Sequence, residues 1–140
     1  MPPDDPEWQR LHEKRSDYAA AGKWARYRTT TLRMAQLRGR QGRLEDSLAA
    51  YLELCYIDLN GAQNPGAAWG MPTRELDPAR SFGLGPLIVR RVAAMARDLG
   101  YDESRLEVEF RARASVMHRS LKLPVAPEEA WQALRAELYH

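Results

Sequence analysis

The sequence predicts an all-α protein: an antiparallel helical bundle of about six helices with a long glycine- and proline-rich loop over residues 61–86. Apolar residues recur at three- or four-residue spacing along most of the chain, which is the spacing of one face of an α-helix. Glycine or proline stands at the end of most of these periodic stretches, as expected at helix boundaries. We find no convincing apolar–polar alternation of the kind that marks a half-buried strand.

A single domain over residues 1–140 is expected from the length of the chain. It divides into a basic helical hairpin region (1–60), the long loop (61–86) and a second helical region (87–140). The N-terminal sequence MPPDDPEW lacks the apolar segment of a signal peptide, and no run approaches the ~18 apolar residues of a membrane span. We therefore expect a cytoplasmic protein with no membrane partner.

Two helices are predicted in the first 42 residues. The first follows Pro6 and ends at Gly22, and the second covers residues 23–42. Apolar residues of the second helix share one face, formed by Trp24, Tyr27, Met34 and Leu37. Three consecutive threonines, residues 29–31, lower its helix propensity, so we expect tertiary contacts to hold this segment in place.

The clearest predicted helix covers residues 43–61. One apolar stripe runs along it, formed by Leu44, Leu48, Tyr51, Leu52, Cys55 and Leu59. The pair Asn60–Gly61 predicts the end of the helix, because glycine readily takes the left-handed conformation found just after a helix. Asp58 then lies near the C-terminus, where the helix dipole disfavours a carboxylate. We expect a cation or a backbone donor from another segment to compensate it.

The segment 61–86 has a different composition, with five glycines and four prolines. Loops of this length are uncommon in compact domains and are usually functional or mobile. Trp69 and Phe82 are expected to anchor the loop, because large aromatic side chains normally pack onto a core.

Three more helices are predicted after the loop, over residues 86–100, 102–123 and 127–139. The first has a broad apolar face, so we expect it to be central in the fold. Two ion pairs with four-residue spacing are expected on the outer side of the second, Glu107–Arg111 and Glu109–Arg113.

A basic region covers residues 10–43. It holds ten basic and two acidic residues, a net charge of +8, which leaves −6 for the rest because the whole chain carries +2. Arg26, Arg33 and Arg40 are seven residues apart, so they form one row about 20 Å long on a helix. A row of guanidinium groups suits a phosphate backbone.

The candidate nucleic-acid or anion contacts are Arg26, Arg33, Arg40, Arg43 and Lys23. Trp8, Trp24 and Tyr27 are candidates for stacking on bases if they are exposed. The alternative is that the arginines pair with local acidic residues and that Trp24 and Tyr27 belong to the buried face of their helix.

Candidate catalytic residues are few. Cys55 as a nucleophile would need a base and an exposed, electropositive site, whereas its place on an apolar stripe favours burial in the core. The histidines are scattered, so the sequence indicates no metal site, and no motif indicates a cofactor. An enzyme with its site under the loop, using Asp58, Tyr56 or Arg80, is the least favoured interpretation.

Residues 31–53 resemble one helix–turn–helix unit of the tetratricopeptide family. The resemblance is carried by a small residue between the helices, a glycine at the turn and apolar residues of the second helix: Ala35, Gly42, Leu44, Leu48 and Tyr51. The stretch departs from the repeat at Thr31, Arg38 and Ser47, and no second copy follows 34 residues later. The resemblance implies an antiparallel helical hairpin and a role in peptide binding.

Two functions follow as hypotheses. The first is a protein–protein interaction module that binds another protein or its own copy through the helical hairpin. The second is a nucleic-acid-binding protein that uses the arginine row.

Overall fold

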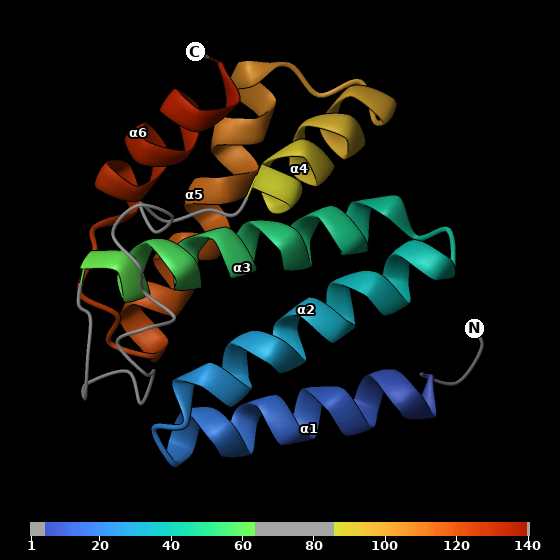
Figure 1. Cartoon of the computed structure of the whole chain (residues 1–140), viewed down its shortest axis with the longest axis vertical. Coiled ribbons are helices and arrows are strands. Elements are labelled where there is room, and N and C mark those ends of the chain that lie inside the picture. Colours follow the sequence, from blue (N-terminus) through green and yellow to red (C-terminus); the bar gives the residue numbers. More distant parts are fainter. Residues whose placement is uncertain (1–4, 64–85, 140) are drawn as a thin grey trace.

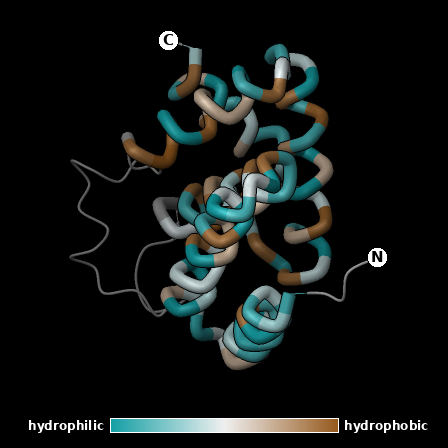
Figure 2. The backbone as a smooth tube through the Cα atoms, turned by 90° about the vertical axis from the view of Figure 1, so that its right-hand side faces the viewer, coloured by the Kyte–Doolittle hydropathy of each residue, from teal (hydrophilic) through white to brown (hydrophobic). Residues whose placement is uncertain are grey.

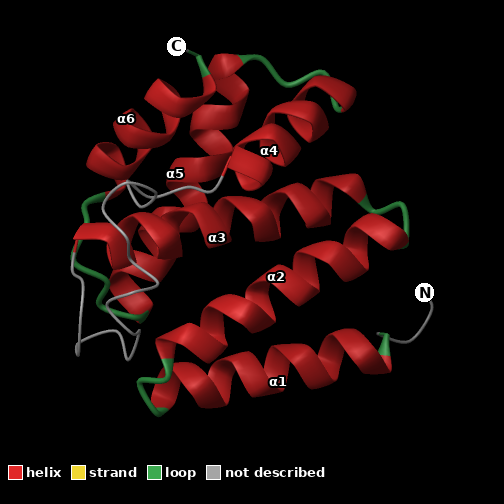
Figure 3. Ribbon diagram, in the orientation of Figure 1, coloured by secondary structure: helices red, strands yellow, loops and turns green. Residues whose placement is uncertain are grey.

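The computed structural model describes residues 5–63 and 86–139 of the chain. These residues form six helices and no strand, so the predicted all-α fold is confirmed (Figures 1 and 3). The helices are α1 (Pro6–Ala20), α2 (Trp24–Arg40), α3 (Leu44–Gln63), α4 (Pro86–Asp98), α5 (Glu103–Ser120) and α6 (Pro127–Leu138). Trp69 and Phe82, the predicted loop anchors, lie outside the described residues, as does most of the predicted loop.

Helix α3 is the centre of the fold. Figure 1 shows α1 and α2 on one side of it and α4, α5 and α6 on the other, and α3 contacts every helix except α1 in a substantial interface. The expectation that the helix over residues 86–100 is central is therefore wrong. Helix α4 buries Val92, Met95 and Ala96 but leaves Leu87 77% exposed, because its apolar face is wider than the surface that α3 and α6 offer it.

The core is built around the buried face of α3. Leu52, Cys55 and Tyr56 of this helix are almost completely buried. On the side of α5 and α6 the aromatic rings of Tyr56, Phe110 and Trp131 pack in sequence, with ring centroids 6.4 Å and 5.9 Å apart. Figure 2 shows α1, at the bottom of the view, as a largely hydrophilic helix, which fits its position at the edge of the fold.

The turn between α1 and α2 and the turn between α2 and α3 each use one glycine. Gly22 and Gly42 have φ of +70° and +74°, a conformation that other residues rarely adopt. Each glycine follows the last turn of a helix, and the residue after it donates a backbone hydrogen bond to the carbonyl five residues back. The sequence signals at these two positions therefore set the short connections that place α1, α2 and α3 side by side.

Helix α3 does not end at Asn60–Gly61, as the sequence pattern predicted, but continues to Gln63. The reason is that Asn60 is fully buried and bonds in two directions. Its amide nitrogen donates to the carbonyl of Tyr56 at 2.8 Å, and its amide oxygen accepts from the backbone N–H of Val125 at 2.8 Å. The hydroxyl of Tyr56 donates to the carbonyl of the same Val125. These bonds tie the segment before α6 to α3.

The threonine run of α2 remains helical. The hydroxyl group of each of the three threonines, residues 29–31, donates a hydrogen bond to the backbone carbonyl four residues earlier. Thr30 and Thr31 are buried against the rest of the fold, so the tertiary contacts outweigh their low helix propensity.

One of the two ion pairs predicted on α5 forms. Arg111 pairs with Glu107 at 2.9 Å, but Glu109 pairs with Arg105 at 3.1 Å rather than with Arg113. An exposed pair within one helix contributes only a few tenths of a kcal/mol. Arg113 lies instead 3.8 Å from Glu53, a largely buried carboxylate of α3 that offers a better partner.

Candidate functional site

The basic residues of the N-terminal region divide into two groups. Arg15 and Arg28 point toward α3 and pair with its carboxylates: Arg15 with Glu53 at 2.9 Å, and Arg28 with Asp58 through two hydrogen bonds. Arg28 is the compensating cation expected for Asp58. A second group is exposed and forms no ion pair within the described residues: Arg10, Lys14, Lys23, Arg26, Arg33 and Arg40. Internal pairing thus accounts for only part of the +8 charge.

Four cations of the exposed group surround one groove between α1 and α2, which we call the basic groove. It is lined by Arg10 and Lys14 of α1 and by Arg33 and Arg40 of α2, with Leu11, Gln36 and Glu7 completing the wall. Its volume is about 280 Å³. Four positive charges and one carboxylate line the groove, so the electrostatic potential of this surface is positive.

Two of the three arginines of the predicted row, Arg33 and Arg40, line this groove, and Arg26 does not. Because α1 and α2 are antiparallel, Arg40 and Arg33 face the first half of α1, while Arg26 lies over the ring of Tyr18 near the end of α1, with 5.9 Å between guanidinium carbon and ring centroid. The other two predicted contacts are elsewhere. Lys23 is the N-cap residue of α2, and Arg43 pairs with Asp46 at 2.8 Å in a different cleft.

The aromatic residues considered for base stacking pack against other side chains of the protein. Tyr27 is buried, and Trp24 packs against it edge-on with ring centroids 5.4 Å apart. The ring of Trp8 is covered by the guanidinium of Arg38, whose central carbon lies 3.8 Å from the ring centroid. Trp24 and Tyr27 therefore fit the alternative hypothesis, in which both rings contribute to the packing of the helices.

Four of the five residues that carry the tetratricopeptide resemblance lie at the contact between α2 and α3, and the fifth, Gly42, lies in the turn that joins these helices. Ala35 is completely buried, and its carbonyl accepts a hydrogen bond from the hydroxyl of Ser47 at 2.7 Å. Gly39 also faces Ser47, since a Cβ at this position would lie 3.3 Å from its hydroxyl oxygen. Leu48 and Tyr51 are buried and Leu44 is half-buried on the same side. Small residues thus allow the two helices to approach closely.

Cys55 is in the core, as its position on the apolar stripe predicted. Its side chain is fully buried, and burial, together with the nearby charge of Asp58, raises the pKa of the thiol far above its usual value. A raised pKa keeps the thiol protonated and burial keeps it from solvent, which is the opposite of what a nucleophilic cysteine requires.

Alkylation of Cys55 tests this conclusion. We expect iodoacetamide to leave the native protein unmodified under conditions that modify the unfolded chain within minutes, because only the unfolded state exposes a thiol with an ordinary pKa. Intact-protein mass spectrometry after timed quenching measures both rates. Equal rates in the native and the unfolded protein would contradict the burial of Cys55.

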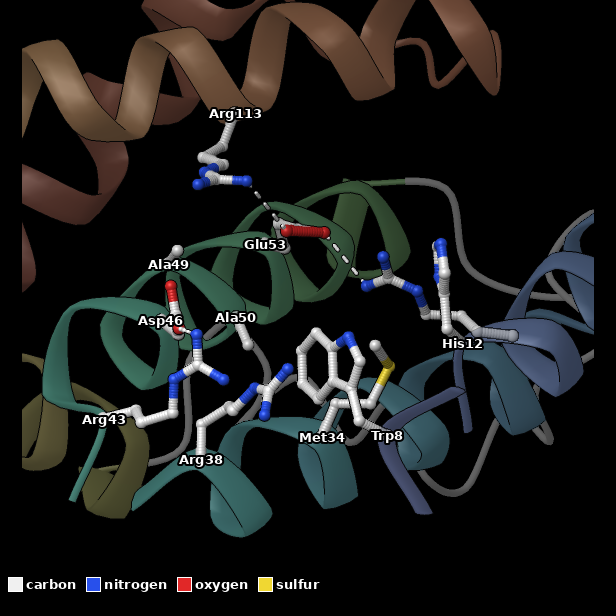
Figure 4. Close-up of a pocket in the computed structure, with 11 residues that line it drawn as sticks. Trp8, His12, Met34, Arg38, Arg43, Asp46, Ala49, Ala50, Glu53 and Arg113 are labelled. Carbon is white, nitrogen blue, oxygen red and sulfur yellow. Dashed lines mark hydrogen bonds and ion pairs between the residues drawn. The ribbon is translucent and has the colours of Figure 1, made fainter. Parts of the chain in front are cut away.

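A second cleft is formed where α1, α2, α3 and α5 meet, and we call it the arginine cleft (Figure 4). Its volume is about 370 Å³. Its charged lining residues are Arg15, Arg38, Arg43, Arg113, Asp46 and Glu53. Trp8, Met34, Ala49 and Ala50 form its apolar surface, and His12 lies at its edge.

Glu53 links the two sides of the arginine cleft. One of its carboxylate oxygens accepts a hydrogen bond from Arg15 of α1 at 2.9 Å, and the other lies 3.8 Å from Arg113 of α5 (Figure 4). The side chains of Arg15 and Glu53 are each about one-seventh exposed, whereas that of Arg113 is about half exposed. The Arg113 guanidinium is thus held loosely near the cleft.

Arg38 is the most buried cation of the arginine cleft. Its residue is only 6% exposed, and it lies against Trp8, with one terminal nitrogen donating to the side-chain oxygen of Gln41 at 2.9 Å. Its Nε atom is buried and has no hydrogen-bond partner among the described residues. A buried donor without a partner is unusual, because it loses the hydrogen bonds that it makes to water.

Sequence reasoning did not predict the arginine cleft. The sequence marks Arg38 only as a departure from the tetratricopeptide pattern, Trp8 as a candidate for base stacking and Arg43 as a candidate nucleic-acid contact. The seven-residue spacing of Trp8 and Arg15 places them on the same side of α1, but nothing in the sequence shows that Arg113, more than 50 residues beyond Glu53, completes the site.

No protein-family model, curated protein or solved structure matches this chain. Within residues 5–63 and 86–139, no group of side chains has the composition of a metal site, and none of the helices there is both long and apolar enough to cross a bilayer. The function is therefore inferred from the two surfaces described above.

Proposed function

We propose that this protein is an interaction module that binds an acidic segment of a protein partner in the basic groove between α1 and α2. The observation that carries the proposal is the charge of this groove. Arg10, Lys14, Arg33 and Arg40 line it without an acidic partner in the described part of the chain, although Arg15 and Arg28 on the opposite sides of the same helices each have one.

A protein partner fits the groove better than a nucleic acid. Leu11 forms an apolar floor between the cations, so a segment that mixes acidic and apolar residues would contact both. Tyr27 is buried and Trp8 is covered by Arg38, which leaves these rings unable to serve as a platform for bases. The resemblance of residues 31–53 to a tetratricopeptide unit adds support, because it implies a role in peptide binding.

Nucleic-acid binding is a second candidate, favoured by the row of Arg26, Arg33 and Arg40. All three are exposed, and the rise of a helix separates successive members by about 10 Å. This function requires contacts to phosphates alone, and it predicts affinity that is independent of sequence and falls steeply with salt.

A binding assay with two kinds of labelled probe tests the proposal. One probe is a peptide of alternating glutamate and leucine, and the others are single- and double-stranded DNA and RNA, measured by fluorescence anisotropy at two salt concentrations. We expect the peptide to bind more tightly than any nucleic acid. We expect the double variant Arg33→Glu/Arg40→Glu to weaken peptide binding by about tenfold or more, because two attractive charges become repulsive.

The matched control is Arg97→Glu/Arg119→Glu, which changes the same charge at exposed positions of α4 and α5. It is expected to retain peptide binding within about twofold, because charges far from the groove are screened by salt. Equal weakening by both variants would show that only net charge matters. Tighter, strongly salt-dependent binding of nucleic acid, lost in the Arg33/Arg40 variant, would replace the proposal with the second candidate.

A further inference from the structure

The arginine cleft carries a charge that its own residues do not balance. Four arginines and two carboxylates line it, which gives a net charge of +2. Both carboxylates are engaged: Asp46 by Arg43, and Glu53 by Arg15 with Arg113 nearby. The remaining cation, Arg38, is 94% buried and forms no ion pair in the described residues. The carboxylate nearest to it is that of Asp5, which Arg38 reaches through Gln41. Burial of an unbalanced charge is costly unless an anion accompanies it.

The donors of the cleft have the geometry that oxyanions require. Guanidinium groups are planar and present paired N–H donors, which match the oxygens of phosphate and carboxylate. Figure 4 shows the guanidinium group of Arg38 beside Trp8 and that of Arg43 beside Asp46, while Arg113 extends toward Glu53 from the other side of the cleft. The Nε of Arg38 is a buried donor that has no partner among the described residues.

The size and apolar surface of the cleft limit the ligand further. Its volume of about 370 Å³ is at the small end of the range for small-molecule sites. Ala49 and the part of Trp8 that Arg38 leaves uncovered offer contact to an apolar group next to the cations. A phosphate monoester carries close to two negative charges at neutral pH, which matches the net charge of the cleft, whereas a single carboxylate carries one.

We propose that the arginine cleft is a binding site for a small phosphate monoester with an apolar body, in which Arg38, Arg43 and Arg113 hold the phosphate group, and Ala49 and the part of Trp8 that Arg38 leaves uncovered contact the body. The site is separate from the basic groove and does not depend on the function proposed for it. Arg38 is the anchor, because it is held in place by Trp8 and Gln41 before the ligand arrives.

Isothermal titration calorimetry with phenyl phosphate, inorganic phosphate and benzoate tests the site. We expect phenyl phosphate to bind at least about tenfold more tightly than benzoate, because the dianion matches the charge of the cleft, and more tightly than inorganic phosphate, which lacks the apolar body. Absence of binding by phenyl phosphate at millimolar concentration would overturn the proposal, and so would equal affinity for benzoate. A short peptide with a central phosphotyrosine should bind no better than phenyl phosphate; clearly tighter binding would contradict a small-molecule ligand.

Two variants locate the binding. Arg43→Gln/Arg113→Gln changes side chains that are about half exposed, so we expect the fold to persist and phenyl phosphate affinity to fall by about tenfold or more. Arg38→Lys keeps the charge but removes Nε and the planar fork, and we expect a similar loss. The control Arg33→Gln/Arg40→Gln removes two charges from the basic groove and should leave phenyl phosphate binding unchanged. An equal loss in this control, or no loss in Arg43→Gln/Arg113→Gln, would overturn the assignment.

Discussion

Replacement of Arg28 by methionine is expected to destabilise the protein by about 3–5 kcal/mol at pH 7, the cost of leaving a buried charge without its partner. Arg28 forms two hydrogen bonds with the carboxylate of Asp58, whose side chain is only 6% exposed. Methionine preserves most of the length of the arginine side chain. The decrease in the free energy of unfolding therefore reflects the loss of the charge pair more than a loss of packing. Chemical denaturation with urea measures the free energy of unfolding.

The same variant should show a characteristic dependence on pH. Burial raises the pKa of Asp58 above its usual value, while Arg28 opposes this rise. Without Arg28 the pKa in the folded state rises further, so the folded variant takes up a proton at a higher pH than the unfolded chain does. Its deficit relative to the wild type is therefore full at neutral pH and shrinks as the pH falls through the raised pKa.

Two further measurements separate the causes. Arg28→Met/Asp58→Asn removes the charge itself and should recover part of the stability at pH 7, with little remaining dependence on pH. Asp58→Asn alone should cost less than Arg28→Met, because the side chain of Arg28 is 31% exposed and retains access to water. A deficit of Arg28→Met that is constant between pH 7 and pH 4 would contradict this account of the pair.

Replacement of Asn60 by leucine is the second large effect, an expected loss of about 2–4 kcal/mol in the free energy of unfolding. Asn60 is fully buried, and its amide oxygen accepts from the backbone N–H of Val125. Leucine has the same branching, with larger terminal groups, but no acceptor, so this N–H is left without a partner inside the protein. Asn60 also bonds the carbonyl of Tyr56, and both bonds are lost together.

The matched control is Tyr56→Phe, which removes the hydroxyl that donates to the carbonyl of Val125. This change is expected to cost only about 1 kcal/mol, because a carbonyl tolerates the loss of one bond better than an N–H group does. Hydrogen exchange of the Val125 amide gives a local measurement, and its protection should fall strongly in Asn60→Leu. Unchanged protection would show that this bond does not hold the segment before α6.

The two surfaces differ in what each demands of the rest of the fold. The basic groove needs only the pairing of α1 with α2, which the turn at Gly22 enforces. The arginine cleft needs four helices in register, because Glu53 and Arg113 come from α3 and α5. Destabilising variants such as Asn60→Leu are therefore expected to lower the affinity of the arginine cleft for phenyl phosphate more than the affinity of the basic groove for the acidic peptide.

Local patterns in the sequence predicted the helices, because helix formation depends on neighbouring residues. Apolar spacing located all six helices, and Gly22 and Gly42 located the turns of the first three. The burial of Cys55 followed from its place on an apolar stripe. The prediction of the helix end failed because Asn60–Gly61 has the composition of a helix end, whereas the buried amide of Asn60 bonds both Tyr56 and the distant Val125.

Tertiary structure alone decided which charges are paired and which are available. Arg28 and Arg33 have the same side chain and lie on the same helix, yet Arg28 meets Asp58 of α3 while Arg33 lines an open groove. Likewise the sequence predicted a pair between Arg113 and Glu109, whereas in the structure Arg113 lies near Glu53. The physical reason is that Coulomb interactions between helices depend on distance and burial, which residues far apart in the sequence acquire only when the chain folds.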